Sequence, residues 1–150
     1  AFFTHESPAI IYSLAEEKHI PKENLLLKPL QRNEIPSVLS LFDASVFFIK
    51  PVFSKKASSP TKQGEIMAMG IPIVCNAGVG DTEEIIRNYE AGAVIDEFTT
   101  YAYEAAYHQI LDGIFNREKA MQGACAWYSL QTGVERYAGV YRELLNHKAS

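Results

Sequence analysis

The sequence predicts an α/β fold in which helices cover both faces of a doubly wound parallel sheet. Four short segments are almost wholly apolar, at residues 25–27, 46–49, 71–75 and 93–95. Stretches with helical spacing of apolar residues lie between them. Strands without polar alternation are buried on both faces, which is typical of parallel sheets whose crossovers are helices. We therefore expect the four segments to be interior strands of one Rossmann-like sheet.

The sequence predicts helices in the stretches between the predicted strands. Ser7 and Pro8 suit the start of a first helix, and Asn33 can cap a short second one. Two more helices are predicted over residues 61–69 and 81–88. After the last strand the pattern changes, and three C-terminal helices are expected at residues 101–115, 117–128 and 134–147.

Length and composition describe an ordinary globular chain and exclude several classes. The 150 residues suffice for one domain, and the net charge of −4 argues against non-specific nucleic-acid binding. No apolar run approaches the roughly 20 residues that span a bilayer, and no signal peptide is recognisable. Cys75 and Cys125 are expected to be reduced thiols, which favours a cytoplasmic protein. The chain opens inside an apolar run, which we interpret as the start of a fragment.

The segment from Ser58 to Glu84, SSPTKQGEIMAMGIPIVCNAGVGDTEE, carries the clearest chemical signal. A small-residue loop with Ser58 and Ser59 leads into a helix that begins near Thr61 and Lys62. Free N–H groups and the positive end of the dipole make a helix N-terminus a site for phosphate, and Lys62 adds a cation. A carboxylate one turn along, at Glu65, can accept hydrogen bonds from a ribose diol. The arrangement predicts a nucleotide-diphosphate site.

The same segment resembles the donor-binding signature of the group 1, retaining glycosyltransferases of the GT-B fold. The family pattern runs from one glutamate across seven residues to a second, then through a small turn, a Pro-Val-Val strand, a glycine turn and a Glu-Ile pair. The matching positions here are Glu65, residues 68–70, residues 71–74, Gly80 and Glu84. Ala57 stands where the pattern has its first glutamate. The SSPTK form is similar to a bacterial surface-polysaccharide branch of the family.

The resemblance implies an architecture and a reaction. GT-B enzymes have two Rossmann-like domains facing a cleft, and residues 1–150 correspond to the donor-binding domain, truncated at its N-terminus, without the acceptor domain. The substrate would be a nucleotide-diphosphate sugar, and the acceptor a glycan or lipid-linked glycan bound by the absent domain. No cofactor, metal or catalytic side chain is implied in this part. The enzyme would be cytoplasmic or peripheral at the inner face of the membrane.

Individual positions also have plainer explanations. Ser58, Ser59, Thr61 and Lys62 are assigned to the donor phosphates and Glu65 to the ribose, although loop hydroxyls and first-turn charges are common in any helix. Three further residues are assigned to a sugar pocket, where turn glycines and local capping are the alternatives: Gly78, Gly80 and Glu84.

Two other classes of function stay open at this stage. A sugar-nucleotide epimerase shares the GT-B layout, although no set of histidine and acid typical of an epimerase is seen. A non-catalytic flavodoxin-like binding module would need only the fold. His5, Lys50 and Asn76 follow predicted strands, so we expect them at the ligand edge of the sheet.

The last predicted helix has one apolar stripe. Its residues recur at spacings of three and four: Val134, Tyr137, Ala138, Tyr141, Leu144 and Leu145. A large exposed apolar patch usually drives association. We expect the helix to fold back on its own domain or, as the second choice, to self-associate through Tyr137 and Tyr141.

Overall fold

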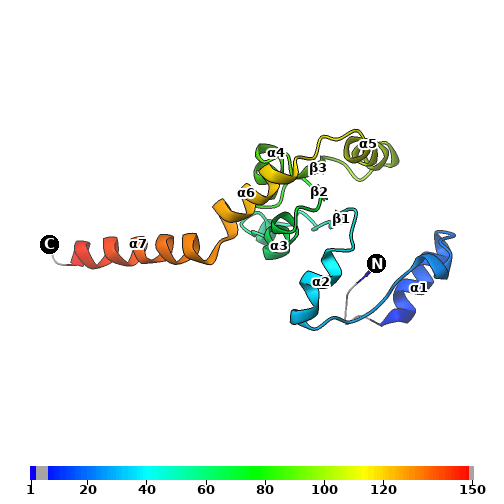
Figure 1. Ribbon diagram of the computed structural model, residues 1–150, viewed down its shortest axis with the longest axis horizontal. Helices are drawn as coiled ribbons and strands as arrows, with labels where there is room; N and C mark the ends of the chain where they lie inside the picture. Colours follow the sequence, from blue (N-terminus) through cyan, green and yellow to red (C-terminus); the bar gives the residue numbers. More distant parts are fainter. Residues whose placement is uncertain (3–6, 149–150) are drawn as a thin grey trace. The chain divides into compact units, whose positions relative to one another are not determined.

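The computed structural model describes residues 1–2 and 7–148 (Figure 1). These residues form two compact units, Ala1–Ser40 and Leu41–Ser150. The predicted site segment lies wholly in the second unit. His5, which we expected at the ligand edge, lies outside the described residues.

The first unit contains α1 (Pro8–Glu17), α2 (Ile35–Leu39) and two 3₁₀ turns, Lys22–Asn24 and Arg32–Glu34. Proline occupies the first turn of both helices, where its missing N–H costs nothing. The prediction of an interior strand at residues 25–27 is wrong. Among the described residues only Leu27 of this run pairs, through a single parallel bridge to Phe2. The N–H of Leu25 donates to the carbonyl of Lys22 and closes the preceding 3₁₀ turn. Pro29 has no N–H, so it cannot donate a hydrogen bond to a neighbouring strand.

The second unit is built on a parallel sheet of three strands in the order β1-β2-β3. The strands are β1 (Ser45–Val46), β2 (Ile73–Asn76) and β3 (Gly92–Ile95). Ser45 pairs with Ile73, and Ile73 pairs in turn with Gly92. The predicted parallel α/β arrangement is confirmed, with β2 as the central strand.

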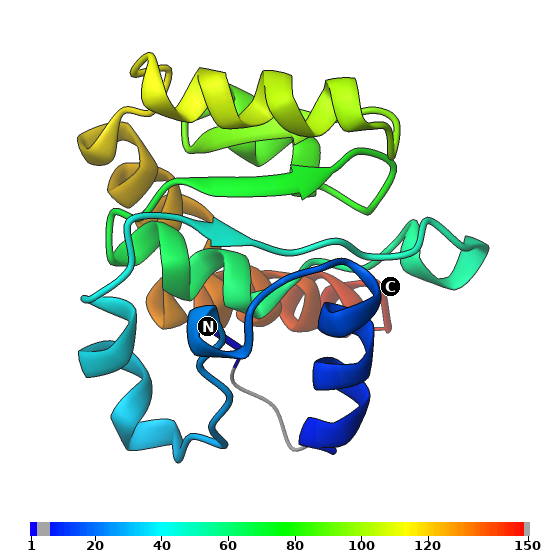
Figure 2. The ribbon, with the colours of Figure 1, turned by 90° about the vertical axis from the view of Figure 1, so that its right-hand side faces the viewer.

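Helices connect and cover these strands. A 3₁₀ turn (Phe53–Lys55) and α3 (Thr61–Ala68) lead from β1 to β2, and α4 (Thr82–Asn88) leads from β2 to β3. They are followed by α5 (Thr100–Leu111), α6 (Arg117–Tyr128) and α7 (Leu130–Lys148). In Figure 1, β2 and β3 lie between α5 and the group of α3, α4 and α6. Figure 2 shows α5 running along the strands on its side of the sheet.

The core follows from the alternation of side chains along the strands. Val74 of β2 packs with Ala93, Ile95 and Ala106, which joins that face of the sheet to α5. Fully buried residues of α3, β2 and α4 complete the interior: Met67, Ile73, Cys75, Ile85 and Ile86. The helical cover on both faces explains why β2 shows no polar alternation.

The first strand is shorter than the predicted segment 46–49. Beyond Val46, the N–H of Phe47 still donates to the carbonyl of Val74 at 3.0 Å. Further along, the side chain of Asn76 takes over both backbone groups of Ile49. The ladder therefore ends because an amide side chain replaces the partner backbone.

Helix α7 does not fold back on its domain, so the preferred expectation for the tail is wrong. Tyr137 is 73% exposed and Tyr141 65% exposed. Val134, Leu144 and Leu145 are exposed on the same helix. The apolar stripe is present, and no described residue covers it.

Candidate functional site

Two loops leave the carboxyl ends of β1 and β2 and meet. The first runs from residue 50 to residue 60, and the second covers residues 77–81. Gly80 has φ +47°, and a β-carbon at this position would lie 2.8 Å from the carbonyl carbon of Ser58. Gly78, with φ +79°, faces Pro51 of the first loop at an ordinary contact distance. The glycines let the second loop lie directly on the backbone of the first.

Asn76 fixes the base of both loops. Its Oδ1 accepts the N–H of Ile49 at 2.7 Å, and its Nδ2 donates to the carbonyls of Ile49 and Ala77, each at 2.9 Å. The side chain is 4% exposed. A buried amide with all of these bonds made is a rigid anchor, because losing any partner would leave a polar group unsatisfied.

The N-terminus of α3 opens at the edge of the sheet where the two loops meet. Pro60 precedes the helix, and no side chain caps it. Thr61 and Lys62 occupy its first turn and are exposed, and Glu65 is exposed on the next turn. An uncapped helix N-terminus offers N–H groups and a positive potential to an anion. This geometry suits a phosphate group lying over the start of α3.

The structure brings some of the predicted residues together and leaves others apart. Ser58 meets Gly80, and Ser59 leads directly into the α3 turn that holds Thr61, Lys62 and Glu65. Glu84 lies in the first turn of α4, where its neighbour Glu83 pairs with Arg87 at 3.0 Å. Glu84 is exposed, and no described contact joins it to the other predicted residues.

Sequence reasoning missed a group of buried polar atoms beneath these loops. Four side-chain atoms in the described part of the chain are buried without a partner of good hydrogen-bond geometry: Gln63 Oε1, Asp81 Oδ1, Thr82 Oγ1 and Tyr128 Oη. Gln63 and Thr82 are linked, because Nε2 of Gln63 donates to the carbonyl of Thr82 at 3.3 Å. Neither an apolar pattern nor the family signature marks these positions, since each depends on contacts between distant segments.

Tyr128 is the most distant of these residues in sequence. Burial raises the pKa of its phenol, the nearby Ser59 hydroxyl opposes the shift, and the charge of Asp81 adds to it. The ring lies against Gly64 of α3, where a β-carbon would come within 2.6 Å of the tyrosine Cβ. The end of α6 is therefore packed against the helix that starts at the candidate phosphate site.

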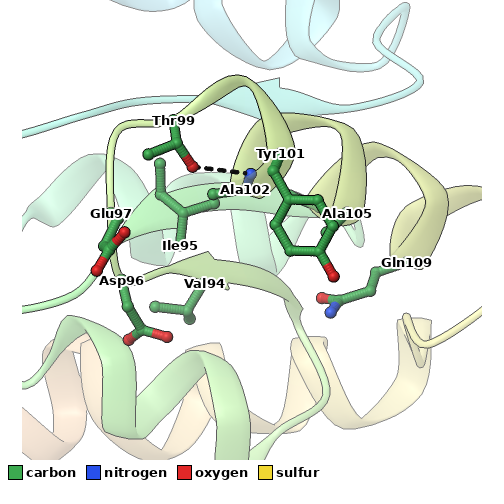
Figure 3. A pocket seen from close by; sticks show the side chains of 10 residues that line it. Val94, Ile95, Asp96, Glu97, Thr99, Tyr101, Ala102, Ala105 and Gln109 are labelled. Carbon is green, nitrogen blue, oxygen red and sulfur yellow. Dashed lines mark hydrogen bonds between the residues drawn. The ribbon is translucent and has the colours of Figure 1, made fainter.

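Two hollows in the second unit lie elsewhere. One, of about 240 Å³, lies where β3 ends and α5 begins (Figure 3). Asp96, Glu97, Tyr101 and Gln109 line it, and Thr99 caps α5 beside it by accepting the N–H of Ala102 at 3.2 Å. Its carboxylates would repel a diphosphate. The other hollow, of about 670 Å³, is mainly apolar and lies between β1 and α5. None of the predicted site residues lines either hollow.

The described residues contain no group of three or more histidine, cysteine or acidic side chains placed to hold a metal ion. Within residues 7–148, every helix is too short or too polar to cross a membrane. Cys75 is buried and Cys125 exposed, and both are free thiols.

Comparison with known proteins agrees with the resemblance carried by the Ser58–Glu84 segment. The family model described as glycosyl transferases group 1 matches residues 6–124. This range spans the two loops, α3 and most of α6. Neither the curated proteins nor the solved structures gave a match.

Proposed function

Because the chain belongs to the group 1 glycosyl transferases, we propose that residues 1–150 form the donor-binding domain of a glycosyltransferase that uses a nucleotide-diphosphate sugar. The observation that carries this proposal is the uncapped N-terminus of α3 at the carboxyl edge of a parallel sheet. It opens beside the loop of residues 77–81, the glycine loop, which holds Gly78 and Gly80. Ligands of open α/β sheets bind at this edge.

The residues of the two loops take separate roles in this proposal. Ser58, Ser59 and Thr61 offer backbone N–H groups and hydroxyls to the diphosphate, and Lys62 supplies a positive charge. Glu65, one turn further along α3, accepts hydrogen bonds from the ribose hydroxyls.

The sugar lies over the glycine loop in this arrangement. Gly78 and Gly80 shape its pocket, because they let the loop of residues 77–81 lie close against the loop of residues 50–60. Glu84, at the start of α4, is assigned to the same pocket. No cofactor is required.

The chemistry is a transfer with retention of configuration at the sugar. As the bond between sugar and phosphate breaks, negative charge develops on the diphosphate. Lys62 and the N–H groups at the start of α3 stabilise that charge in place, which lowers the barrier to leaving-group departure. No metal ion is needed for this step, since the cation and the helix N-terminus supply the positive potential.

The acceptor is a growing glycan or lipid-linked glycan of bacterial surface polysaccharide, held by a separate domain. The enzyme works in the cytoplasm or at the inner face of the membrane. The 150 residues alone are then expected to bind the donor nucleotide weakly and to transfer no sugar. Sugar transfer by this chain in isolation would contradict the assignment of the acceptor to another domain.

Self-association through α7 is part of the same proposal. Tyr137 and Tyr141 are exposed on one apolar stripe, and burying such a stripe against a second copy is favourable. Sedimentation velocity at increasing concentration should show a dimer that Tyr137→Ser weakens. A strictly monomeric chain at high concentration would remove this contact.

Titration with UDP, GDP and their sugars tests the function most directly. A donor-binding domain predicts saturable binding of one nucleoside diphosphate and weaker binding of the matching nucleoside. A non-catalytic module of flavodoxin type predicts no preference for any of these ligands. Conversion of one nucleotide sugar to its epimer, without an acceptor, would instead identify an epimerase.

A further inference from the structure

We propose that Gln63 is a positioning residue that holds the glycine loop in place relative to the first turn of α3, and that it thereby controls how much the sugar adds to donor affinity. The inference rests on the proposed function and deepens it. Gln63 belongs to neither loop and is not among the residues assigned to the phosphates, the ribose or the sugar. Its side chain joins the start of α3 to the start of α4.

Gln63 is the third residue of α3 and lies on the buried face of that helix. Thr61 and Lys62 of the same turn are exposed, whereas Gln63 is fully buried together with Ile66 and Met67. Glutamine is mostly exposed in proteins, and burying its amide is unfavourable unless hydrogen bonds replace those to water. The contact that this amide makes is therefore the reason to look for a role.

The amide of Gln63 reaches across to the end of the glycine loop. Its Nε2 donates to the carbonyl oxygen of Thr82 at 3.3 Å. Thr82 is the first residue of α4, directly after the loop, and is 1% exposed. A carbonyl oxygen only accepts, and the amide Oε1 has no proton to donate, so the amide can make this bond in one orientation alone.

The glycine loop is held near both ends and in its middle. Asn76 bonds to its first residue, and Gly80 rests on the backbone of Ser58. Gln63 bonds to Thr82, just beyond its last residue. Of these three contacts, that of Gln63 is the one made by α3 itself, the helix whose N-terminus is proposed to bind the phosphates. It therefore links the proposed phosphate site directly to the proposed sugar pocket.

A nucleotide sugar would touch both of these parts at once. Its phosphates would lie over the start of α3 and its sugar over the glycine loop, so both contacts form only when the two parts are correctly spaced. Holding them in place before the ligand arrives lowers the cost of binding. A nucleoside diphosphate has no sugar, so its affinity should not depend on where the glycine loop lies.

The same hydrogen bond should contribute little to stability. The Thr82 carbonyl lies in the first turn of α4, where a helical carbonyl also accepts the N–H four residues further on. It therefore keeps a partner when Gln63 is replaced. Oε1 of Gln63 is buried without a partner of good geometry, which is unfavourable. An apolar side chain of similar length at this position should leave the free energy of unfolding unchanged or raise it.

The test is Gln63→Met in the 150-residue chain, with binding of UDP, GDP, UDP-glucose and GDP-mannose measured by calorimetry. Methionine keeps the length of the side chain and removes the amide. The quantity compared is the ratio of the affinity for a nucleotide sugar to that for its nucleoside diphosphate. We expect this ratio to fall roughly fivefold, the effect of one net hydrogen bond. The affinity for the nucleoside diphosphate should not change, and the midpoint of urea unfolding should stay the same or rise.

Met67→Leu is the matched control. Met67 is also fully buried on α3, one turn further along, and packs on α6 at Gly123, where a β-carbon would lie 2.7 Å from its Cε. The leucine variant disturbs the packing of the same helix face without touching the link to Thr82. It should leave the affinity ratio as it is in the unmodified chain.

Gln63→Glu tests whether the donated proton is what matters. A carboxylate cannot donate to the Thr82 carbonyl, whereas a protonated carboxyl can. Burial raises the pKa of a carboxyl group, so acidification should restore the donor. The affinity ratio, relative to that of the unmodified chain at the same pH, should be low at about pH 9 and recover at about pH 5. Gln63→Met decides the question if the glutamate variant does not fold at alkaline pH.

The outcomes separate this role from the proposed function. An unchanged affinity ratio in Gln63→Met, an equal fall in Met67→Leu, or a folded Gln63→Glu that does not recover on acidification would each overturn the positioning role. In these cases binding of UDP or GDP by the unmodified chain still supports a donor-binding domain. If the unmodified chain binds neither UDP nor GDP, the donor-binding function fails and the role of Gln63 fails with it.

Discussion

The backbone of Gly80 lies against the carbonyl group of Ser58 so closely that no β-carbon fits between them. This contact joins the loop of residues 77–81, after β2, to the loop of residues 50–60, before α3. Both loops leave neighbouring strands of a parallel sheet, and their contact makes them one surface. The shape of the candidate site therefore depends on a residue that has no side chain.

Gly80→Ala should destabilise the chain more than alanine at Gly78 or Gly113. Left-handed backbone costs a non-glycine residue roughly 1–2 kcal/mol, and at Gly80 the clash with Ser58 adds to this cost. Gly78→Ala and Gly113→Ala are the controls, since both have positive φ and room for a β-carbon. Urea unfolding of the three variants measures the difference, and UDP binding should weaken only in Gly80→Ala or most strongly there. Equal losses of stability would mean that the loops can separate freely.

Asn76→Ala should cost about 2–4 kcal/mol of unfolding free energy. The substitution leaves the N–H and carbonyl of Ile49 and the carbonyl of Ala77 without their partner, and an unsatisfied buried group costs about 1–3 kcal/mol. Asn76→Asp is a sharper comparison, because a carboxylate cannot donate to the two carbonyls. Denaturant titration of both variants checks this, and the aspartate variant should be more stable at acidic pH than at neutral pH. A loss below about 0.5 kcal/mol, the size of an ordinary surface effect, would contradict the anchoring role.

Glu65→Ala and Lys62→Ala should separate the contribution of the ribose to donor affinity from that of the phosphates. Loss of the glutamate removes charge-assisted hydrogen bonds of roughly 1.5–3 kcal/mol each. Nucleotide affinity is then expected to fall by about one to two decades, for nucleoside and nucleoside diphosphate alike. Lys62→Ala should weaken diphosphate binding far more than nucleoside binding. Calorimetry with nucleoside and nucleoside diphosphate measures these losses of affinity. Glu84→Ala, which removes a carboxylate from the first turn of α4, is the control. An equal effect of Lys62→Ala on both ligands would remove Lys62 from the phosphate site.

Stability should fall at alkaline pH because of Cys75. Burial, with a smaller effect from the charge of Glu83, raises the pKa of this thiol to about 12. In the unfolded chain the thiol ionises near its usual value of about 8.5. Between these values the unfolded state loses a proton that the folded state keeps, so rising pH favours unfolding by up to about 1.4 kcal/mol per pH unit. The stabilisation is present below about pH 8.5.

Urea unfolding between pH 7 and pH 11 measures this slope, and Cys75→Val should flatten it. The raised pKa of Tyr128 adds a slope of the same sign at the alkaline end, so some dependence should remain in the valine variant. Thiol labelling under native conditions gives an independent check, because the exposed Cys125 should react and the buried Cys75 should not. Identical slopes in both proteins would show that the Cys75 thiolate is tolerated in the fold.

Local patterns were enough to predict the parallel sheet and the helices around the site. The helix from Arg117 to Tyr128 has the bounds expected from the sequence, and α3 begins at Thr61 as the loop composition indicated. Apolar runs also placed β2 and β3 correctly, apart from their ends. These successes share a cause, since each signal lies within the element that it predicts.

The errors arise where distant residues decide the outcome. The end of β1 is set by the Asn76 side chain. At residues 25–27, the N–H of Leu25 is used in the preceding turn, and Pro29 just beyond the run has no N–H. Tyr128 carries no mark of its contact with Gly64, because the two residues belong to different helices. Glycine at position 64, inside a helix where alanine would be preferred, was the one visible hint of a close approach.

The approach of α6 to α3 at Gly64 and Gly123 also bears on how the molecule opens. Helices locked by small residues cannot slide past each other without unpacking, so α3 and α6 should protect their amides from hydrogen exchange as a single cooperative unit. Helix α7, whose apolar residues are exposed, should exchange faster and independently. Ligand-dependent motion at the proposed phosphate site would then be confined to the two loops, while α3 stays in place.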